Sequence, residues 1–302
     1  MKRIAIFDAT NLIFRSFFAV PPLSTSDGQA TNAVVGSLKT FRTTIQELKP
    51  DYVILSWDSG GKNFRHTQDP TYKAQRPPIN SDLKSQFSIV QDAFARLQIP
   101  QIIAPPNIEG DDLTGSIAVQ AVKAGYEAII VSSDKDFYQL CRPNLKIYSF
   151  TVKKKDNKGL VDEEYIYREF NCTPKQLIGI KSLTGEKSDN ITGVDGIGPK
   201  TATSLITKHG SIKNLISYCI ENPNNKISDK ILANLDIIVN AYTLAEIKTD
   251  IKIPDNMPVK SVDCIIINEV ELKAFFEHYE LQGFLNNFSQ WANLFDYVTP
   301  VR

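Results

Sequence analysis

Short apolar runs alternate with longer amphipathic stretches through the first 150 residues, and this alternation constrains the fold more than any other feature of the sequence. It is typical of βαβ units, in which a mainly parallel sheet is covered by helices. Each apolar run is rich in Ile or Val and is followed by a polar residue or a turn. We predict strands at residues 4–7, 52–57, 101–104, 128–132 and 145–149, and helices at about 31–48, 81–97 and 111–124.

The pattern changes near residue 173. Short helical stretches with Gly, Pro and Asn breaks continue to about residue 246, and the β-rich stretch 261–267 is expected to add an edge strand. The sequence therefore predicts an α/β domain over residues 1–173 and a mostly helical domain over residues 174–302. A hydrophobic content of 42% with 23% charged residues supports a buried core and excludes a wholly disordered chain.

Several classes of protein are excluded by what the sequence lacks. No apolar run approaches the roughly 18 residues that a membrane helix needs, and the apolar run near the start is too short for a signal peptide. The four cysteines lie more than 30 residues apart, and the three histidines are scattered. Neither a zinc site nor a disulfide framework is indicated. We expect a cytoplasmic protein that does not bind a membrane.

Acidic residues follow four successive predicted strands. They are Asp8 after the first, Asp58 after the second, Glu109, Asp111 and Asp112 after the third, and Asp134 and Asp136 after the fourth. Each alone could stabilise a helix start or cap a turn. Together they meet at one edge of the sheet, because functional groups gather at the carboxyl ends of parallel strands.

Seven acids at one edge repel one another and raise one another's pKa unless a cation lies between them. Their oxygen ligands suit Mg²⁺ or Mn²⁺. Two such ions about 4 Å apart can activate a water and stabilise the leaving oxygen of a phosphodiester. Phosphatases that use an Asp nucleophile after the first strand need a second acid two residues later, but Asp8 is followed by Ala9 and Thr10.

A glycine-rich segment begins the second predicted domain. Gly196, Gly198 and Pro199 indicate a tight turn into a helix whose first residue is proline. Its backbone N–H groups would suit a phosphate, with Lys200 on the following helix. Glu186 and Asp189 precede the turn, lie on one face if that stretch is helical, and could reach the acidic edge from the other domain.

Basic residues dominate residues 62–84, where Lys62, Arg65, Lys73, Arg76 and Lys84 are interleaved with aromatic residues and prolines. This stretch could be a solvated loop. A basic loop beside a metal site could also hold a nucleic-acid strand. A second basic run, residues 153–155, is expected at a solvated hairpin tip.

The net charge argues weakly against a nucleic-acid ligand, because 34 basic residues balance 34 acidic ones. The nine carboxylates of the predicted site distort this balance, since only 25 acidic residues remain without them. Bound divalent ions would also offset part of the local negative charge. We therefore treat neutrality as weak evidence in either direction.

The motifs resemble those of the 5′-nuclease domain of DNA polymerase I and of the flap endonucleases, over nearly the whole chain. The matching segments are residues 7–8, 25–28, 57–58, 64–66, 72–74, 109–112, 133–140 and 184–202. The resemblance implies a PIN-like α/β fold with a helical domain that contains a helix-three-turn-helix motif. It implies a structure-selective 5′-3′ exonuclease and flap endonuclease that uses two or more Mg²⁺ ions.

The resemblance also implies roles for residues. The first metal cluster would comprise Asp8, Asp58, Glu109, Asp111 and Asp112, and the second Asp134, Asp136, Glu186 and Asp189. A helical arch over about residues 62–97 would place Lys73 and Arg76 on the scissile or terminal phosphate, with Arg65 as a further DNA contact. The turn with Gly193, Gly196, Gly198, Lys200 and Thr201 would grip the duplex backbone, with K⁺ held by turn carbonyls.

Two departures from the family pattern stand out. Glu186 stands where the family generally has Asp, and its extra methylene moves the carboxylate by about 1 Å. Gly115, after the paired acids, costs about 1 kcal/mol relative to Ala in a helix. The chain ends without a polymerase, so we expect a free-standing monomeric nuclease beside a separate DNA polymerase. Its substrate would be DNA with 5′ flaps or 5′ ends, and RNA annealed to DNA is a further candidate.

Two other functions stay open. The chain could be a module that binds DNA flaps or junctions without cutting them, although none of its nine acids is missing. It could also be an RNA-directed nuclease on a similar fold, although the glycine motif favours contact with duplex DNA. Cleavage that depends on a divalent ion would separate a nuclease from the binding module.

Overall fold

The first part of the chain forms the mainly parallel sheet that the sequence predicts. The computed structural model describes residues 1–152, 159–253 and 259–297. The strands are β1 (Arg3–Asp8), β2 (Tyr52–Trp57), β3 (Gln101–Ile103), β4 (Glu127–Val131), β5 (Leu145–Tyr148), β6 (Leu160–Val161) and β7 (Lys260–Ser261). Their order is β3-β2-β1-β4-β5-β6, with β1 to β5 parallel; β6 and β7 run antiparallel to β5 and β2.

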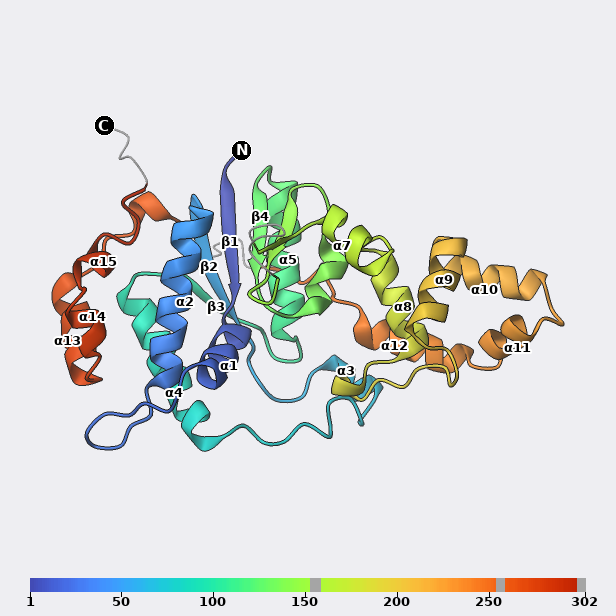
Figure 1. Cartoon of the computed structure of the whole chain (residues 1–302), viewed down its shortest axis with the longest axis horizontal. Helices are drawn as coiled ribbons and strands as arrows, with labels where there is room; N and C mark the ends of the chain where they lie inside the picture. Colours follow the sequence, from blue (N-terminus) through green and yellow to red (C-terminus); the bar gives the residue numbers. More distant parts are fainter. Residues whose placement is uncertain (153–158, 254–258, 298–302) are drawn as a thin grey trace.

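Helices cover both faces of this sheet (Figure 1). One face carries α1 (Ala9–Ala19), α2 (Asn32–Leu48) and α4 (Ser81–Arg96), and the other carries α5 (Gly110–Lys123), the 3₁₀ helix η1 (Lys135–Leu140) and α7 (Glu163–Phe170). The side chains of each strand alternate between the two cores. Phe7 of β1 faces the first core and Ile6 the second, as the two-residue period of a strand requires.

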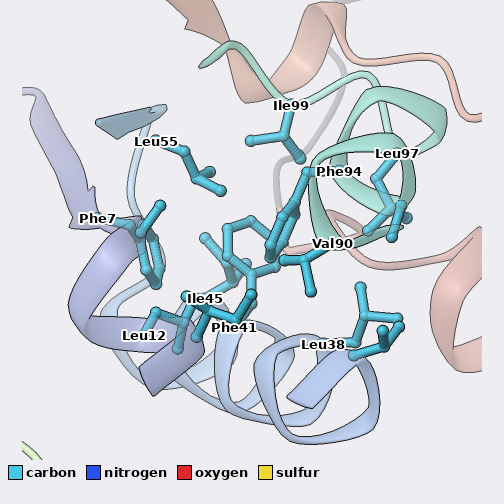
Figure 2. Packing of buried hydrophobic residues seen from close by; sticks show 14 of the residues in the cluster. Phe7, Leu12, Leu38, Phe41, Ile45, Leu55, Val90, Phe94, Leu97 and Ile99 are labelled. Atoms are coloured by element: carbon cyan, nitrogen blue, oxygen red, sulfur yellow. The ribbon is translucent and has the colours of Figure 1, made fainter. Parts of the chain in front are cut away.

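The core on the α2 side is held by aromatic contacts. Phe41 of α2 lies with its ring centroid 4.8 Å from that of Phe7 and 4.9 Å from that of Phe94 on α4 (Figure 2). Leu83, Val90 and Phe94 are all fully buried. Helix α4 therefore belongs to the core and not to the arch over residues 62–97. The part of that stretch that crosses the molecule is residues 62–80, with α3 (Phe64–Gln68) at its start.

A group of helices lies together at one end of the molecule (Figure 1). It comprises α8 (Gln176–Thr184), the 3₁₀ helix η2 (Lys187–Asp189), α9 (Pro199–His209), α10 (Ile212–Glu221), α11 (Lys226–Leu232) and α12 (Leu235–Ala245). They share a core of their own that includes Leu183, Ile206 and Leu215. Gly198 caps α9 and Pro199 is its first residue, as the sequence predicts.

The C-terminal part of the chain packs on the α/β body and not on this helical group. It contains η3 (Val262–Cys264), α13 (Glu269–His278), α14 (Gln282–Leu285) and α15 (Ser289–Ala292). Phe276 and Trp291 join the core formed by α2 and α4, and the guanidinium of Arg42 lies over the Trp291 ring. The division of the chain at residue 173 stays a prediction, but the segment from residue 259 lies outside the helical group.

Other local predictions differ from the structure. The stretch 261–267 contributes only the first residue of that range to β7 before it turns into η3. Helix α1 was not predicted from the sequence, and it starts directly after β1 because Asp8 caps it. The basic run 153–155 lies outside the described residues. Within the described ranges, no helix is long and apolar enough to cross a membrane.

Candidate active site

A cavity of about 750 Å³ lies where the carboxyl ends of the parallel strands face the helical group. Eight of the nine predicted carboxylates line it, and they come from five separate segments of the chain. They are Asp8, Asp58, Glu109, Asp111, Asp134, Asp136, Glu186 and Asp189. The structure thus brings together the acids of strand ends and the two acids that precede the glycine turn. Their role as metal ligands stays a prediction.

Local backbone structure fixes several of these side chains. Asp8 accepts the N–H of Asn11 at 2.9 Å and caps α1, and Asp134 accepts the N–H of Asp136 at 2.8 Å and caps η1. Asp58 accepts the N–H groups of Gly60 and Gly110 at 2.6 and 3.1 Å. These acids therefore cap local backbone and also gather at the cavity: Asp8 and Asp134 each use one oxygen for a backbone N–H, and Asp58 uses both.

Burial and like charge oppose ionisation of the innermost acids. Burial, with further contributions from Asp134 and Asp58, raises the pKa of Asp8 from 3.8 to about 7, although hydrogen bonds from Asn11 and Ser132 lower it. Burial raises the pKa of Asp111 well above its usual value, and the charges of Asp8 and Asp134 add to this. Positive charge in the cavity would reverse both shifts.

The stability of the protein without metal should therefore depend on pH through Asp8. The folded protein holds the Asp8 proton more tightly than the unfolded chain, so the free energy of unfolding falls as the pH rises from 3.8 to about 7. We expect urea unfolding in EDTA to show this decline in the parent protein and a shallower one in Asp8→Asn. Mg²⁺ should remove most of the difference, and equal slopes for the two proteins would contradict the prediction.

Asp112 has a different position from its neighbour Asp111. Its side chain is fully buried and outside the cavity lining. Its two oxygens accept from the guanidinium of Arg65 at 2.7 and 2.8 Å, and one also accepts the N–H of Lys248 at 2.8 Å. Asp112 is thus committed to a buried ion pair in this structure, and its assignment as a metal ligand stays a prediction that the structure does not favour.

Arg65 is also not available to DNA. Its side chain is only 2% exposed, and besides Asp112 it donates to the backbone oxygens of Leu244 and Glu246 at 2.9 and 2.6 Å. It also contacts Glu109 at 3.3 Å, and its guanidinium lies 4.5 Å from the centroid of the Phe64 ring. Arg65 therefore connects the end of α12 to the start of α5, and these buried contacts disfavour the DNA contact predicted for it, which stays a prediction.

Lys73 and Arg76 face the cavity, as the sequence predicts, but they contact carboxylates there. The Lys73 ammonium lies 3.1 Å from Glu109 and 4.0 Å from Asp189, and Arg76 lies 2.6 Å from Asp189. The backbone N–H of Lys73 donates to the backbone carbonyl oxygen of Asp189 at 2.9 Å. The segment that crosses the molecule is thereby attached to the loop that carries Asp189.

Two side chains in the cavity wall were missed by the sequence predictions. Lys181 on α8 contacts Asp136 and Glu186, and the Tyr72 hydroxyl donates to Glu109 at 3.3 Å. Tyr72 stands beside Lys73 in a matching motif, so its position could have been inferred. Lys181 gives no comparable signal, because its partner Asp136 lies 45 residues earlier in the chain.

The donor set of the cavity fits a hard divalent cation. All eight carboxylates offer oxygen, the ligand atom that Mg²⁺ and Mn²⁺ prefer, and a cation beside Asp8 and Asp111 would lower their raised pKa values. As the side chains stand, no group of three or more His, Cys, Asp or Glu within the described residues is arranged to hold an ion. Lysine ammonium groups instead lie against Glu109 and Asp136.

The glycine turn has two kinds of glycine. A Cβ on Gly193 would lie 2.2 Å from the carbonyl carbon of Thr184, so this glycine is required for close packing of two backbone segments. Gly196 has a φ of +71°, and both it and Gly198 are exposed, as are Lys200 and Thr201. The exposed part of the turn offers backbone groups and an ammonium to a ligand, whereas Gly193 serves the fold.

The sequence and the fold were compared with those of known proteins. Residues 3–171 match the family model of the 5′-3′ exonuclease N-terminal resolvase-like domain, and residues 172–264 match its C-terminal SAM fold. A 5′-3′ exonuclease of Aquifex aeolicus is 31% identical over 93% of this chain and 96% of its own length. DNA polymerase I of Bacillus caldotenax is 29% identical over 94% of this chain, which spans about a third (32%) of that relative.

Solved structures show the same architecture. A T5 D15 flap endonuclease in a complex with DNA and metal ions has a TM-score of 0.65 at 22% identity, over 92% of this chain and 98% of the other. At this identity the likeness shows the fold alone. Both family models, the Aquifex relative and the carboxylate-lined cavity agree, and the chain belongs to the 5′-3′ exonuclease family, a family of nucleases.

Proposed function

We propose that this protein is a structure-selective, metal-dependent 5′-3′ exonuclease and 5′-flap endonuclease that hydrolyses phosphodiester bonds in DNA. The observation that carries the proposal is the convergence of eight carboxylates and two basic side chains, Lys73 and Arg76, on one cavity. The carboxylates are suited to divalent ions, and the two basic side chains are suited to the phosphate that the ions would hold. Removal of flaps or RNA primers during replication and repair is the corresponding role.

Within this proposal the carboxylates divide into two groups. Asp8, Asp58, Glu109 and Asp111 would hold one ion, and Asp134, Asp136, Glu186 and Asp189 would hold another. Divalent ions, Mg²⁺ or Mn²⁺, supply an activated water and stabilise the leaving oxygen when they are bound. Asp112 is left out of the ligand set because Arg65 and Lys248 occupy its oxygens.

The protein's own side chains would orient the substrate. Lys73 and Arg76 would move from Glu109 and Asp189 to the phosphate, where they would stabilise the charge that develops during hydrolysis. The exposed turn around Gly196, Gly198 and Lys200 would contact the duplex backbone without reading its sequence. Carbonyls of that turn are the proposed K⁺ ligands.

Further parts of the proposal concern partners and location. The substrates would be DNA with 5′ flaps or 5′ ends, and RNA annealed to DNA as a second substrate. A separate DNA polymerase would fill the gap that cleavage leaves. We propose that the protein acts as a monomer in the cytoplasm. Each of these statements rests on the family and on the chemistry of the cavity.

The central test is single-turnover cleavage of a labelled 5′-flap duplex in Mg²⁺, Mn²⁺ or EDTA. We expect cutting near the flap junction with either ion and none in EDTA. Asp134→Asn should lose at least about 10²-fold in rate, while Asp92→Asn, which changes a half-exposed acid of α4 outside the cavity lining, keeps the parent rate. Tight binding of the duplex without cutting in either ion would instead establish the non-cutting binding module.

Lys73→Met tests the role of the basic side chains in the same assay. Loss of its charge from the phosphate should slow cleavage by about 10²-fold and change duplex binding much less, because the duplex is held mainly at the glycine turn. Lys62→Met removes an exposed charge from the same basic stretch and should leave the rate unchanged. A rate loss of equal size in both variants would show a general effect of charge and not a role for Lys73.

A further inference from the structure

The ammonium of Lys181 lies between two carboxylates of the proposed second metal group. It forms a short ion pair with Asp136 on η1, and its distance from Glu186 is 3.5 Å. Asp136 belongs to the α/β body, whereas Lys181 and Glu186 belong to the helical group. The lysine therefore holds the two parts of the second group together with a positive charge of its own.

The surroundings keep this arrangement charged and partly dry. The side chains of Lys181 and Asp136 are only 24% and 25% exposed, and that of Glu186 is 34% exposed. Burial lowers the pKa of Lys181, but Asp136 and Glu186 outweigh it and raise the pKa above its usual value. Glu186 also accepts the hydroxyl of Ser188 at 2.8 Å. The ammonium thus stays protonated where an ion would otherwise supply the countercharge.

In the first group one acid is ion-paired: Glu109 contacts Lys73 at 3.1 Å and Arg65 at 3.3 Å. Asp8, Asp58 and Asp111, the other three acids of this group, have no ion pair among the described residues, whereas Asp136, Glu186 and Asp189 of the second group are all paired. An ion that binds there relieves repulsion. An ion that binds between Asp136 and Glu186 must instead break two ion pairs that already exist, so its net affinity is lower by the strength of those pairs.

We propose that Lys181 is a built-in counter-cation that competes with the divalent ion at the second carboxylate group and makes that ion the weaker-bound of the two. The proposal rests on the proposed function, since it takes the second group to be a metal site. Glu186 has a part in this arrangement, because its carboxylate lies 3.5 Å from the Lys181 ammonium. Binding of the second ion would release the ammonium from both acids.

The test is equilibrium binding of Mn²⁺ to the full-length protein without DNA, measured by electron paramagnetic resonance of the free ion. In the parent protein we expect one tighter and one weaker ion. Lys181→Met should tighten the weaker ion by about tenfold, since one unit charge a few ångströms from the ion is removed. Lys181→Arg should keep the weak affinity, and the tighter ion should change by less than about twofold.

A matched control separates this pairing from a general change in charge. Lys187→Met removes an ammonium six residues away that has no carboxylate partner within the described ranges, and it should not alter either affinity. Equal tightening in Lys187→Met and Lys181→Met, or an unchanged weaker ion in Lys181→Met, would overturn the proposal. If Lys181→Met does not fold, Lys181→Gln gives the same comparison.

The same titration separates a failure of the counter-cation from a failure of the proposed metal-dependent function. If the parent protein binds two Mn²⁺ ions and Lys181→Met leaves both unchanged, the counter-cation is wrong and the proposed function stands. If the parent protein binds no Mn²⁺ at all, the proposed metal-dependent function fails, and the counter-cation fails with it.

Discussion

Replacement of Asp111 with Asn is expected to slow flap cleavage by about 10³-fold or more and, at the same time, to stabilise the protein in the absence of metal. The rate falls because a proposed metal ligand is lost, which removes about 4 kcal/mol of barrier lowering. Stability rises because Asp111 lies half-buried beside Asp8 and Asp134, and desolvation together with their charges raises its pKa. At neutral pH the folded protein must either ionise this group against its neighbours or take up a proton, and Asn needs neither.

The two effects have separate measurements. Single-turnover cleavage in Mg²⁺ gives the rate, and urea unfolding in EDTA at neutral pH gives the stability. Mg²⁺ should stabilise the parent protein more than Asp111→Asn, since the ion binds the folded state of the parent more tightly. Loss of stability together with activity would mean that Asp111 supports the fold and would contradict its role at the proposed metal site.

The adjacent substitution should have the opposite effect on stability. Asp112→Asn is expected to lower the free energy of unfolding by about 3 kcal/mol or more, because it leaves the buried charge of Arg65 without its main partner. Glu109, 3.3 Å from the guanidinium, can compensate only in part. The N–H of Lys248 can still donate to the Asn oxygen, so the loss comes mainly from the ion pair.

A double-mutant cycle checks this explanation. Arg65→Met alone should also destabilise the protein, since it leaves Asp112 ionised in the core. The double variant Arg65→Met with Asp112→Asn should be less destabilised than the sum of the two single changes by about 1–3 kcal/mol. Additive effects would mean that the two side chains do not act as a pair. Asp111→Asn serves as the control, because it removes the same charge one residue away.

The ion pairs in the cavity wall bear on how the site can function. Three basic side chains of the cavity wall are engaged by acids proposed as ligands: Lys73 by Glu109, Arg76 by Asp189, and Lys181 by Asp136. An ion that takes these acids would free the basic groups. In the proposed function, metal binding and the positioning of phosphate contacts are therefore coupled through exchange of partners.

The sequence by itself determined the α/β architecture and the gathering of acids. Buried parallel strands are short apolar runs, and β2 occupies the predicted range 52–57. Asp8, Asp58 and Asp134 each follow a strand or turn at the carboxyl end of the sheet, where adjacent parallel strands must bring them together. These inferences need only strand periodicity and strand direction, which are local properties of the chain.

Tertiary structure alone decided which acids are available to a ligand. Asp111 and Asp112 are adjacent on α5, so their side chains point in directions about 100° apart. The rotation of α5 against the sheet turns Asp111 toward the cavity and Asp112 toward Arg65. Nothing local distinguishes the two, because the partners of Asp112 lie 47 residues before it and 136 residues after it.

Contacts between distant segments of the chain also explain the other differences between the sequence predictions and the structure. Helix α4 reads as part of a basic arch because its first turn carries Lys84 of the basic stretch, but Phe94 packs on Phe41 of α2 and draws the helix into the core. Lys181 has no acidic neighbour that reveals its contact with Asp136 across the cavity. The sequence determines which charges the protein carries and near which edge they gather; only the packing of distant segments decides which of them are paired.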